Sequence, residues 1–307
     1  MKKFLINIIS FFLVVVLAGI FIIFLPATPR AKESLLFSSF EKDSLMEYTS
    51  PPRFILLGGS NVGMGINSRL IKDSLHMNPI NTGFHAAVGL KFMLDNAEPF
   101  IREGDVVVII PEYHQFYARY GYGREEAMRM VFDVSLSNAG KLSLDQWINA
   151  LKYIPKYIRS KLRVTSYFYS FASLDPIYTK YAYNTYGDAV IHWDLPKPEH
   201  ISPFDAAGPY NSKIMQYMAD FIQRMEKKRA RVYVSYPGLL DTYLHNERVI
   251  QIEYEYEKQG FHLLGSPSDY SIPEKMIYDT PYHLTKAGAD FRTEALIRNY
   301  KKAVREE

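Results

Sequence analysis

The chain has no cysteine among its 307 residues, which excludes disulfides, thiolate nucleophiles and metal sites built on cysteine. It also has no Walker sequence, and its near-match to a glycine-rich nucleotide motif, GYGREE at 121–126, has no predicted strand before it. An excess of one charge is missing as well, because 36 basic and 33 acidic residues leave a net charge of +3 without any long basic run. The composition therefore does not favour a nucleotide or a nucleic acid as a partner.

One long apolar run stands at the N-terminus. Residues 4–25 read FLINIISFFLVVVLAGIFIIFL, with Asn7 and Ser10 as the clearly polar members. A helix of these 22 residues is about 33 Å long, which is enough to cross the core of a bilayer. The apolar part of a secretory signal is usually shorter, about 7 to 15 residues, and no small-x-small cleavage sequence follows closely. Residues 1–25 are therefore interpreted as an uncleaved transmembrane anchor, with a cleaved signal peptide as the alternative.

The charges that flank this run predict its orientation. Lys2 and Lys3 favour a cytoplasmic N-terminus, although Arg30 and Lys32 on the other side weaken that bias. The remaining chain, which begins with a polar connector at 26–52, is then expected outside the cytoplasmic membrane, in the periplasm or the extracellular space.

Residues 53–307 are expected to form one domain, because short apolar runs there alternate with helical patterns. GDVVVII at 104–110 and RVYVSYP at 231–237 are of the kind buried on both faces of a parallel sheet. Further strands are expected at 54–57, around Ile80 and at 261–267, and helices at 66–75, 88–102, 212–228, 242–259 and 286–303. This alternation predicts an α/β fold with a doubly wound parallel sheet that binds ligands at the carboxyl ends of its strands.

The alternation stops between residues 114 and 210. This Tyr-rich stretch, with a helix expected over 142–162, is interpreted as an insertion over the active-site face. Its segment 147–163 mixes aromatic side chains with lysines and arginines. That mixture is typical of a solvated helix face, but it also suits anionic lipid headgroups or a partner.

The first predicted strand runs into glycines and a serine in FILLGGSNVGMGI at 54–66. Ser60 either caps the following helix or presents a nucleophilic hydroxyl at the carboxyl end of the strand. A nucleophile needs a base within hydrogen-bond reach and a third group that orients the base. The segment YDTPYHLTKAGADFRTEAL at 278–296 offers both, because Asp279 stands four residues before His283 in a loop. Thr285 is expected to cap the helix that follows.

Taken together, LLGGSN, NTGFHAAVGL, GDVVVIIPEY and the late Asp–His pair resemble the block order of the SGNH (GDSL-like) hydrolase superfamily. More narrowly, the chain resembles the membrane-anchored SGNH-like proteins of bacterial cell-envelope polysaccharide assembly, such as those of alginate O-acetylation and teichoic acid D-alanylation. The resemblance covers 53–113 and 231–300 but not the insertion. It implies a flavodoxin-like three-layer sandwich without a cofactor, in which Ser60 is the nucleophile, His283 the base and Asp279 the orienting acid.

The resemblance also implies an oxyanion hole built from the nucleophile's amide, an amide of the second block and an asparagine of the third. The second-block position falls on Ala86, with Gly83 and Gly89 as alternatives. The third block reads Pro-Glu-Tyr-His in place of Gly-x-Asn-Asp, so that its asparagine is missing and Asn61 is considered as a substitute. Two other departures are Gly-Gly-Ser-Asn in the first block and an Asp–His spacing of four where the superfamily usually has three.

Other polar residues lie near predicted strand ends. Glu112 and Tyr113 are considered as substrate-binding residues, with a buried acid or a salt bridge as the other interpretation of Glu112. His85 and His114 also lie near strand ends, but no third ligand with a suitable spacing accompanies them, so no metal site is predicted.

The expected activity is serine-dependent acyl transfer or ester hydrolysis on a cell-envelope or exported polysaccharide, as an O-acetyltransferase or an esterase. The resemblance implies an acetyl group and a polytopic membrane acyltransferase as partner, and an aromatic content of 15% suits sugar stacking. The alternative is a non-catalytic SGNH-like module that binds glycan or docks a membrane acyltransferase, which the missing third-block asparagine favours.

Overall fold

The computed structural model describes residues 1–170 and 174–306. Its central sheet has five strands in the order β2-β1-β3-β4-β6, and every neighbouring pair is parallel. The strands are β1 (Arg53–Gly58), β2 (Asn78–Asn81), β3 (Val106–Ile110), β4 (Arg231–Ser235) and β6 (Leu263–Leu264). The predicted α/β fold with a parallel sheet is confirmed, and the strand order is that of flavodoxin-like doubly wound sheets.

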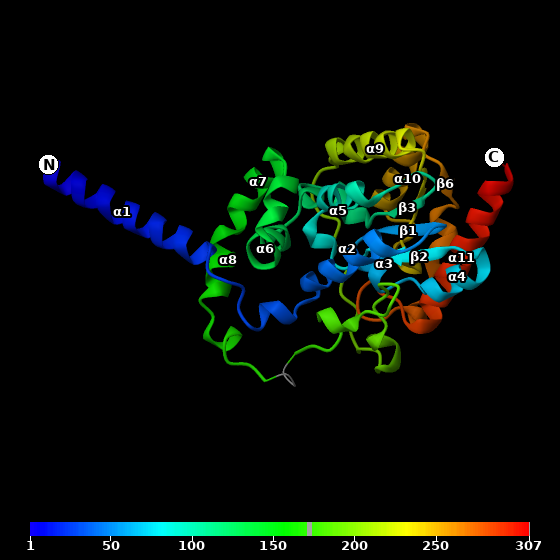
Figure 1. Cartoon of the computed structure of the whole chain (residues 1–307), viewed down its shortest axis with the longest axis horizontal. Helices are drawn as coiled ribbons and strands as arrows, with labels where there is room; N and C mark the ends of the chain where they lie inside the picture. Colours follow the sequence, from blue (N-terminus) through cyan, green and yellow to red (C-terminus); the bar gives the residue numbers. More distant parts are fainter. Residues whose placement is uncertain (171–173, 307) are drawn as a thin grey trace.

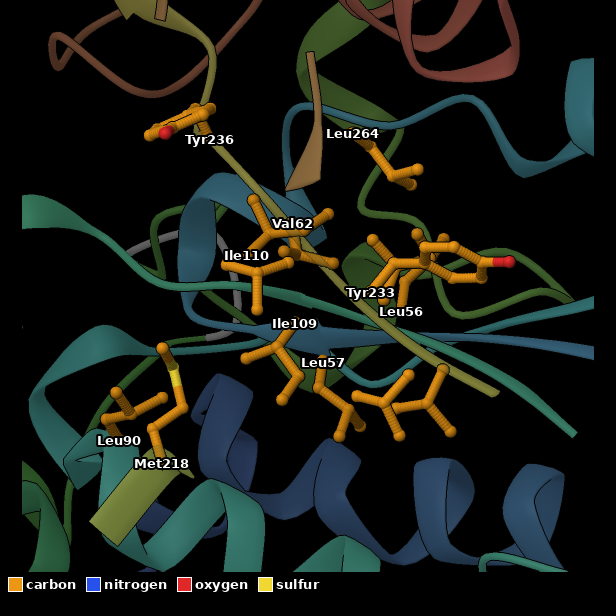
Figure 2. Close-up of a cluster of buried hydrophobic side chains, with 14 of the residues drawn as sticks. Leu56, Leu57, Val62, Leu90, Ile109, Ile110, Met218, Tyr233, Tyr236 and Leu264 are labelled. Carbon is orange, nitrogen blue, oxygen red and sulfur yellow. The ribbon is translucent and has the colours of Figure 1, made fainter. Parts of the chain in front are cut away.

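Strands β1 and β3 form the centre of the core because every one of their residues is buried. Helices cover both faces of the sheet (Figure 1). Figure 2 shows Leu57 and Ile109 on the side of Leu90 and Met218, which belong to α5 (Leu90–Ala97) and α9 (Ser212–Lys227). On the other face, the ring of Tyr300 in α11 (Lys286–Glu306) packs edge-on against Phe54 and Tyr233. The remaining covering helices are α3 (Ser60–Gly63), α4 (Ser68–Leu75) and α10 (Glu247–Gln259).

The carboxyl ends of β1 and β3 lie side by side. Gly58 is in register with Ile110, the last residue of each strand. The two segments that follow, 59–60 and 111–112, therefore leave the sheet at the same edge. The register of the two strands by itself therefore brings Ser60 close to Glu112.

Three expected helices are interrupted in the structure. The helix expected at 88–102 becomes a 3₁₀ turn (Ala86–Val88), α5 and a second 3₁₀ turn (Glu98–Phe100), because Gly89 has a φ of +90° and ends the first turn. The helix expected at 142–162 is split into α7 (Leu144–Ala150), a 3₁₀ turn and α8 (Ile154–Lys161), with Pro155 in the first turn of α8. In place of 242–259, α10 begins at Glu247, after a cap by Asn246.

A second, two-stranded sheet was not predicted. It pairs β5 (Leu239–Leu240) with β7 (Ser271–Ile272). Strands of two residues are too short to show the alternation on which strand prediction depends.

The N-terminal helix and the first helices of the insertion lie on the left side of Figure 1. Helix α1 (Lys2–Ile23) projects away from the sheet and is long and apolar enough to cross a membrane. Helix α2 (Ser39–Tyr48) follows in the connector, and the insertion contributes α6 (Glu125–Arg129), α7, α8 and several 3₁₀ turns. The prediction of an apolar N-terminal helix of spanning length is confirmed.

Candidate active site

The turn after β1 holds Ser60 at the edge of the sheet. Ser60 is the first residue of α3, and Gly59 occupies the cap position. A Cβ atom on Gly59 would lie 2.7 Å from Glu112 Oε1 and 2.8 Å from the Cβ of Ala86, so the close approach of three segments requires glycine there. The Ser60 side chain makes no cap hydrogen bond, and its hydroxyl donates to Glu112 Oε1 at 3.2 Å. The interpretation of Ser60 as a helix cap is therefore wrong.

Asp279 and His283 form a hydrogen-bonded pair in the loop before α11. His283 Nδ1 lies 2.7 Å from Asp279 Oδ1. The loop is closed by the Tyr278 N–H, which donates to the His283 carbonyl at 2.8 Å, and the N–H of Leu284 donates to the carbonyl of Met64, just beyond α3, at 3.2 Å. The last contact joins the late loop to the Ser60 segment across more than two hundred residues. Because Nδ1 is engaged by Asp279, Nε2 is the ring nitrogen left for another partner.

The helix after this loop begins as the sequence predicts. The hydroxyl of Thr285 accepts a hydrogen bond from the N–H of Gly288 at 3.3 Å, which is the geometry of a helix cap. The cap fixes the start of α11, at Lys286, three residues after His283.

The Asp279 carboxylate is stabilised in its charged form. Burial by itself raises the pKa of Asp279, but the hydrogen bond and charge of His283 and the hydroxyl of Tyr178 outweigh it and lower that pKa below its usual value. Tyr178 donates its hydroxyl hydrogen bond to Asp279 Oδ2. Burial, followed by the charge of Asp279, raises the pKa of Tyr178 far above its usual value, so the phenol stays protonated. The Asp279 carboxylate thus receives one hydrogen bond on each oxygen.

Ser60 and His283 line one cavity of about 290 Å³. Its other polar lining residues are His85, Glu112, His114, Tyr120, Tyr178, Ser202, Asp205, Thr280 and Tyr282. Among the residues that the structure describes, no hydrogen bond joins Ser60 directly to His283, because the hydroxyl is turned toward Glu112. The cavity therefore brings the predicted nucleophile and base together, with the predicted orienting acid hydrogen-bonded to the base and the serine hydroxyl turned away from it.

Glu112 is the second carboxylate of the site. It is 2% exposed, and its Oε1 accepts hydrogen bonds from the Ser60 hydroxyl and from the N–H of Asn61 at 3.0 Å. Its Oε2 lies 3.4 Å from His114 Nε2, and the N–H of Glu112 donates to Gln115 Oε1 at 3.0 Å. Glu112 is therefore a buried acid, as one of the two interpretations made from the sequence has it; it also lines the cavity, and substrate binding by Glu112 stays a prediction.

Four predicted site residues do not line the cavity: Asp279, whose carboxylate is hydrogen-bonded to the cavity residue His283, and Asn61, Gly89 and Tyr113. The Asn61 amide donates to the carbonyl of Ile110 at 3.0 Å and accepts from the N–H of Gly59 at 3.1 Å, so it ties the turn to β3. Gly89 uses its N–H on the Ala86 carbonyl at 3.0 Å. Tyr113 is 1% exposed and belongs to the hydrophobic core. The structure therefore corrects the assignment of Asn61 and Gly89 as oxyanion donors and of Tyr113 as a substrate contact.

Two residues that line the cavity have backbone N–H groups without a partner in the described part of the chain. Among the hydrogen bonds of the described residues, none uses the N–H of Ser60 or that of Ala86, whereas the N–H of Gly83 donates to Asn81 Oδ1 at 3.0 Å. Ser60 and Ala86 both line the cavity, and Ala86 touches the Gly59 position. Of the second-block alternatives, Ala86 alone thus has a free N–H at the cavity wall, and two such donors form the minimum of an oxyanion hole.

The insertion supplies site residues that sequence reasoning missed. Tyr178, Ser202 and Asp205 line the cavity, and the N–H of Ser202 donates to the Asp279 carbonyl at 2.8 Å. No motif marks these positions. The one available signal was topological, because an insertion that follows β3 starts at the carboxyl edge of the sheet, where the cavity lies.

The site residues do not resemble a metal centre. Within residues 1–170 and 174–306, no group of three or more histidines, aspartates and glutamates is arranged to hold a metal ion.

The chain matches no model of a known protein family, and no curated protein is significantly similar to it in sequence.

Proposed function

We propose that the protein is an SGNH-like serine esterase or O-acyltransferase in which Ser60 is the nucleophile. The observation that carries this proposal is the Asp279–His283 pair, held at 2.7 Å, in the same cavity as a serine at the carboxyl end of β1. A histidine oriented by a carboxylate is the arrangement that activates a serine hydroxyl.

In the proposed reaction, Ser60 rotates from Glu112 toward His283 and its Oγ attacks the acyl carbonyl of a donor ester. His283 Nε2 takes the hydroxyl proton and returns it to the oxygen of the leaving alcohol, so that an acyl ester on Ser60 remains. In the second half, His283 takes a proton from an acceptor hydroxyl or from water. The new oxygen attacks the acyl carbon, and Ser60 leaves with the proton. The N–H groups of Ser60 and Ala86 are the proposed donors to the oxyanion.

The proposed substrate is an ester on a cell-envelope or exported polysaccharide, acetyl being the proposed group. The length of α1, which is enough to span a bilayer, supports this class. We propose that α1 anchors the chain with its domain outside the cytoplasm, where such a polysaccharide is within reach. The aromatic lining of the cavity by Tyr120, Tyr178 and Tyr282 suits the faces of sugar rings. A polytopic membrane acyltransferase is the proposed donor-side partner.

The test is labelling of the full chain, in detergent, with a fluorophosphonate probe. We expect labelling of the wild type and of Ser202→Ala, which removes another hydroxyl of the same cavity. We expect none in Ser60→Ala, and at least a hundredfold slower labelling in His283→Gln. Equal labelling of Ser60→Ala and the wild type would contradict the assignment of the nucleophile.

A non-catalytic glycan-binding or docking module is the second candidate. The observation that favours it is the hydrogen bond from Ser60 to a carboxylate in place of the base. This candidate predicts no labelling of the wild type, together with unchanged polysaccharide acylation in cells that carry Ser60→Ala.

A further inference from the structure

The C-terminal end of α1 is fastened to the insertion. Ile23 packs against a cluster that includes Tyr157, and the ring of Phe24 meets Phe132 edge-on at 5.4 Å. Lys161 donates to the carbonyls of Leu25 and Pro26 at 2.7 and 3.2 Å. These contacts involve particular side chains and are partly buried. They therefore hold the C-terminal end of α1 in a fixed position relative to α8.

The lysine that makes these contacts is itself anchored. Lys161 is 2% exposed and pairs with Asp133 at 2.6 Å, and Tyr157 donates a hydrogen bond to the same carboxylate at 2.9 Å. A buried ion pair with several hydrogen bonds is expensive to break. The insertion and the end of α1 therefore behave as one rigid unit.

Four exposed cations lie along the segment next to this junction. Lys156 and Arg159 lie on α8, Lys152 lies in the 3₁₀ turn just before it, and Arg163 follows its C-terminal end. Lys156 pairs with Glu125 at 2.9 Å, whereas Arg159 and Arg163 have no acidic partner among the described residues. A groove of about 940 Å³ along α8 is lined by Lys156, Arg159 and Arg163. Glu125, Glu126 and Arg129 line the same groove, so the excess of positive charge there comes from Arg159 and Arg163.

Exposed apolar side chains accompany the cations. Leu144, Ile148 and Leu151 follow the i, i+4, i+7 spacing of one helix face and are 75%, 53% and 61% exposed. After α8, Leu162 and Phe168 are 57% and 82% exposed. A monomer in water rarely exposes so many large apolar side chains within one short segment.

We propose that this surface, the α7–α8 face (the four cations and five apolar side chains named above), rests on the bilayer that α1 crosses and binds anionic phospholipid headgroups. The occupant follows from position and charge: α7 and α8 lie beside the end of α1 (Figure 1), and mixed basic and apolar side chains are typical of membrane-surface helices. The proposal rests on α1 spanning a membrane and is independent of the chemistry at Ser60.

The absence of cysteine makes the test direct. A nitroxide is attached to Ile148→Cys in the full chain, in nanodiscs of phosphatidylcholine with or without phosphatidylglycerol. The matched control is Tyr254→Cys, a 60% exposed position on α10 at the other side of the molecule. The accessibility of each label to oxygen and to a water-soluble nickel chelate is measured. We expect the ratio of oxygen accessibility to nickel accessibility to be several-fold higher at 148 than at 254. We expect this difference to grow when phosphatidylglycerol is present.

A charge variant tests the headgroup contribution. Replacing Lys152, Lys156, Arg159 and Arg163 by glutamine is expected to make the label at 148 accessible to the water-soluble nickel chelate. The reason is that each cation strengthens binding to an anionic surface about fivefold. The control variant replaces four exposed lysines elsewhere by glutamine, namely Lys213, Lys227, Lys275 and Lys301. Circular dichroism verifies that both fold.

Three outcomes would overturn the proposal. The first is a label at 148 as accessible to the nickel chelate as the label at 254 in both lipids. The second is a label at 148 that is buried in the bilayer to the same extent with and without phosphatidylglycerol and in the charge variant. Anionic headgroups would then not be what this surface binds. The third is protection that appears in native membranes but not in nanodiscs, which identifies a protein as the occupant.

Discussion

Two acid–histidine pairs lie at the cavity of Ser60, Asp279–His283 and Glu112–His114, and they differ in which groups their carboxylates bind. The Asp279 carboxylate accepts hydrogen bonds from His283 and Tyr178, so it orients a ring nitrogen. The Glu112 carboxylate accepts hydrogen bonds from the Ser60 hydroxyl and the N–H of Asn61, while His114 Nε2, at 3.4 Å, makes no hydrogen bond. In the proposed reaction the first pair moves a proton, whereas the second fixes the chain and the resting position of the serine.

The largest expected effects come from the Asp279–His283 pair. His283→Gln removes the base, and Asp279→Asn deprives it of its orienting acid, so each is expected to lower turnover of p-nitrophenyl acetate by about 10³- to 10⁴-fold. The measurement is the initial rate of the full chain in detergent. If Asp279→Asn kept more than a tenth of the wild-type rate, the two pairs would not differ as proposed.

Glu112→Gln is expected to have a moderate effect of the opposite sign. The glutamine Oε1 still accepts from Ser60 and Asn61, but the negative charge that competes for the serine hydroxyl is gone. Turnover of the same ester is therefore expected to rise by up to about tenfold. A loss of more than a hundredfold would show that Glu112 itself takes the proton.

Glu112→Ala is the companion variant for the structural role. It leaves the N–H of Asn61 buried without an acceptor, and we expect the free energy of unfolding in urea to fall by about 1–3 kcal/mol. Glu112→Gln keeps that acceptor and serves as the control.

Tyr178→Phe is expected to have a smaller effect, with a fewfold loss of turnover at neutral pH. The variant removes one of the hydrogen bonds that lower the pKa of Asp279, so that pKa rises toward its usual value. Since the pair acts with Asp279 ionised, the acid limb of the rate profile moves to higher pH. The check is a pH–rate profile beside that of Tyr120→Phe, another tyrosine of the cavity; an unmoved limb would contradict the role given to Tyr178.

The sequence predicted the first pair better than the second because local spacing carries the first. Asp279 and His283 are four residues apart in one loop, and the apolar runs of β1 and β3 fix the edge where Ser60 must lie. The functions of Asn61 and Gly89 depend on where a single amide or N–H points, which spacing does not determine. Tyr178 lies 101 residues from Asp279, in an insertion without periodicity, so only the fold brings them together.

The smallest effect is expected at His114, and it concerns stability. Burial lowers the pKa of His114 below its usual value, and the neighbouring Glu112 only partly offsets this. Below about pH 6.5, the unfolded chain then binds a proton that the folded chain does not, so stability falls as the pH falls through that region. His114→Phe keeps the ring contacts with Tyr120 and Tyr282 and removes the titrating group. We therefore expect its free energy of unfolding in urea to fall less between pH 7.5 and 5.0 than that of the wild type. An equal fall in both would mean that His114 is protonated in the folded state beside Glu112, and the two pairs would then be alike in charge.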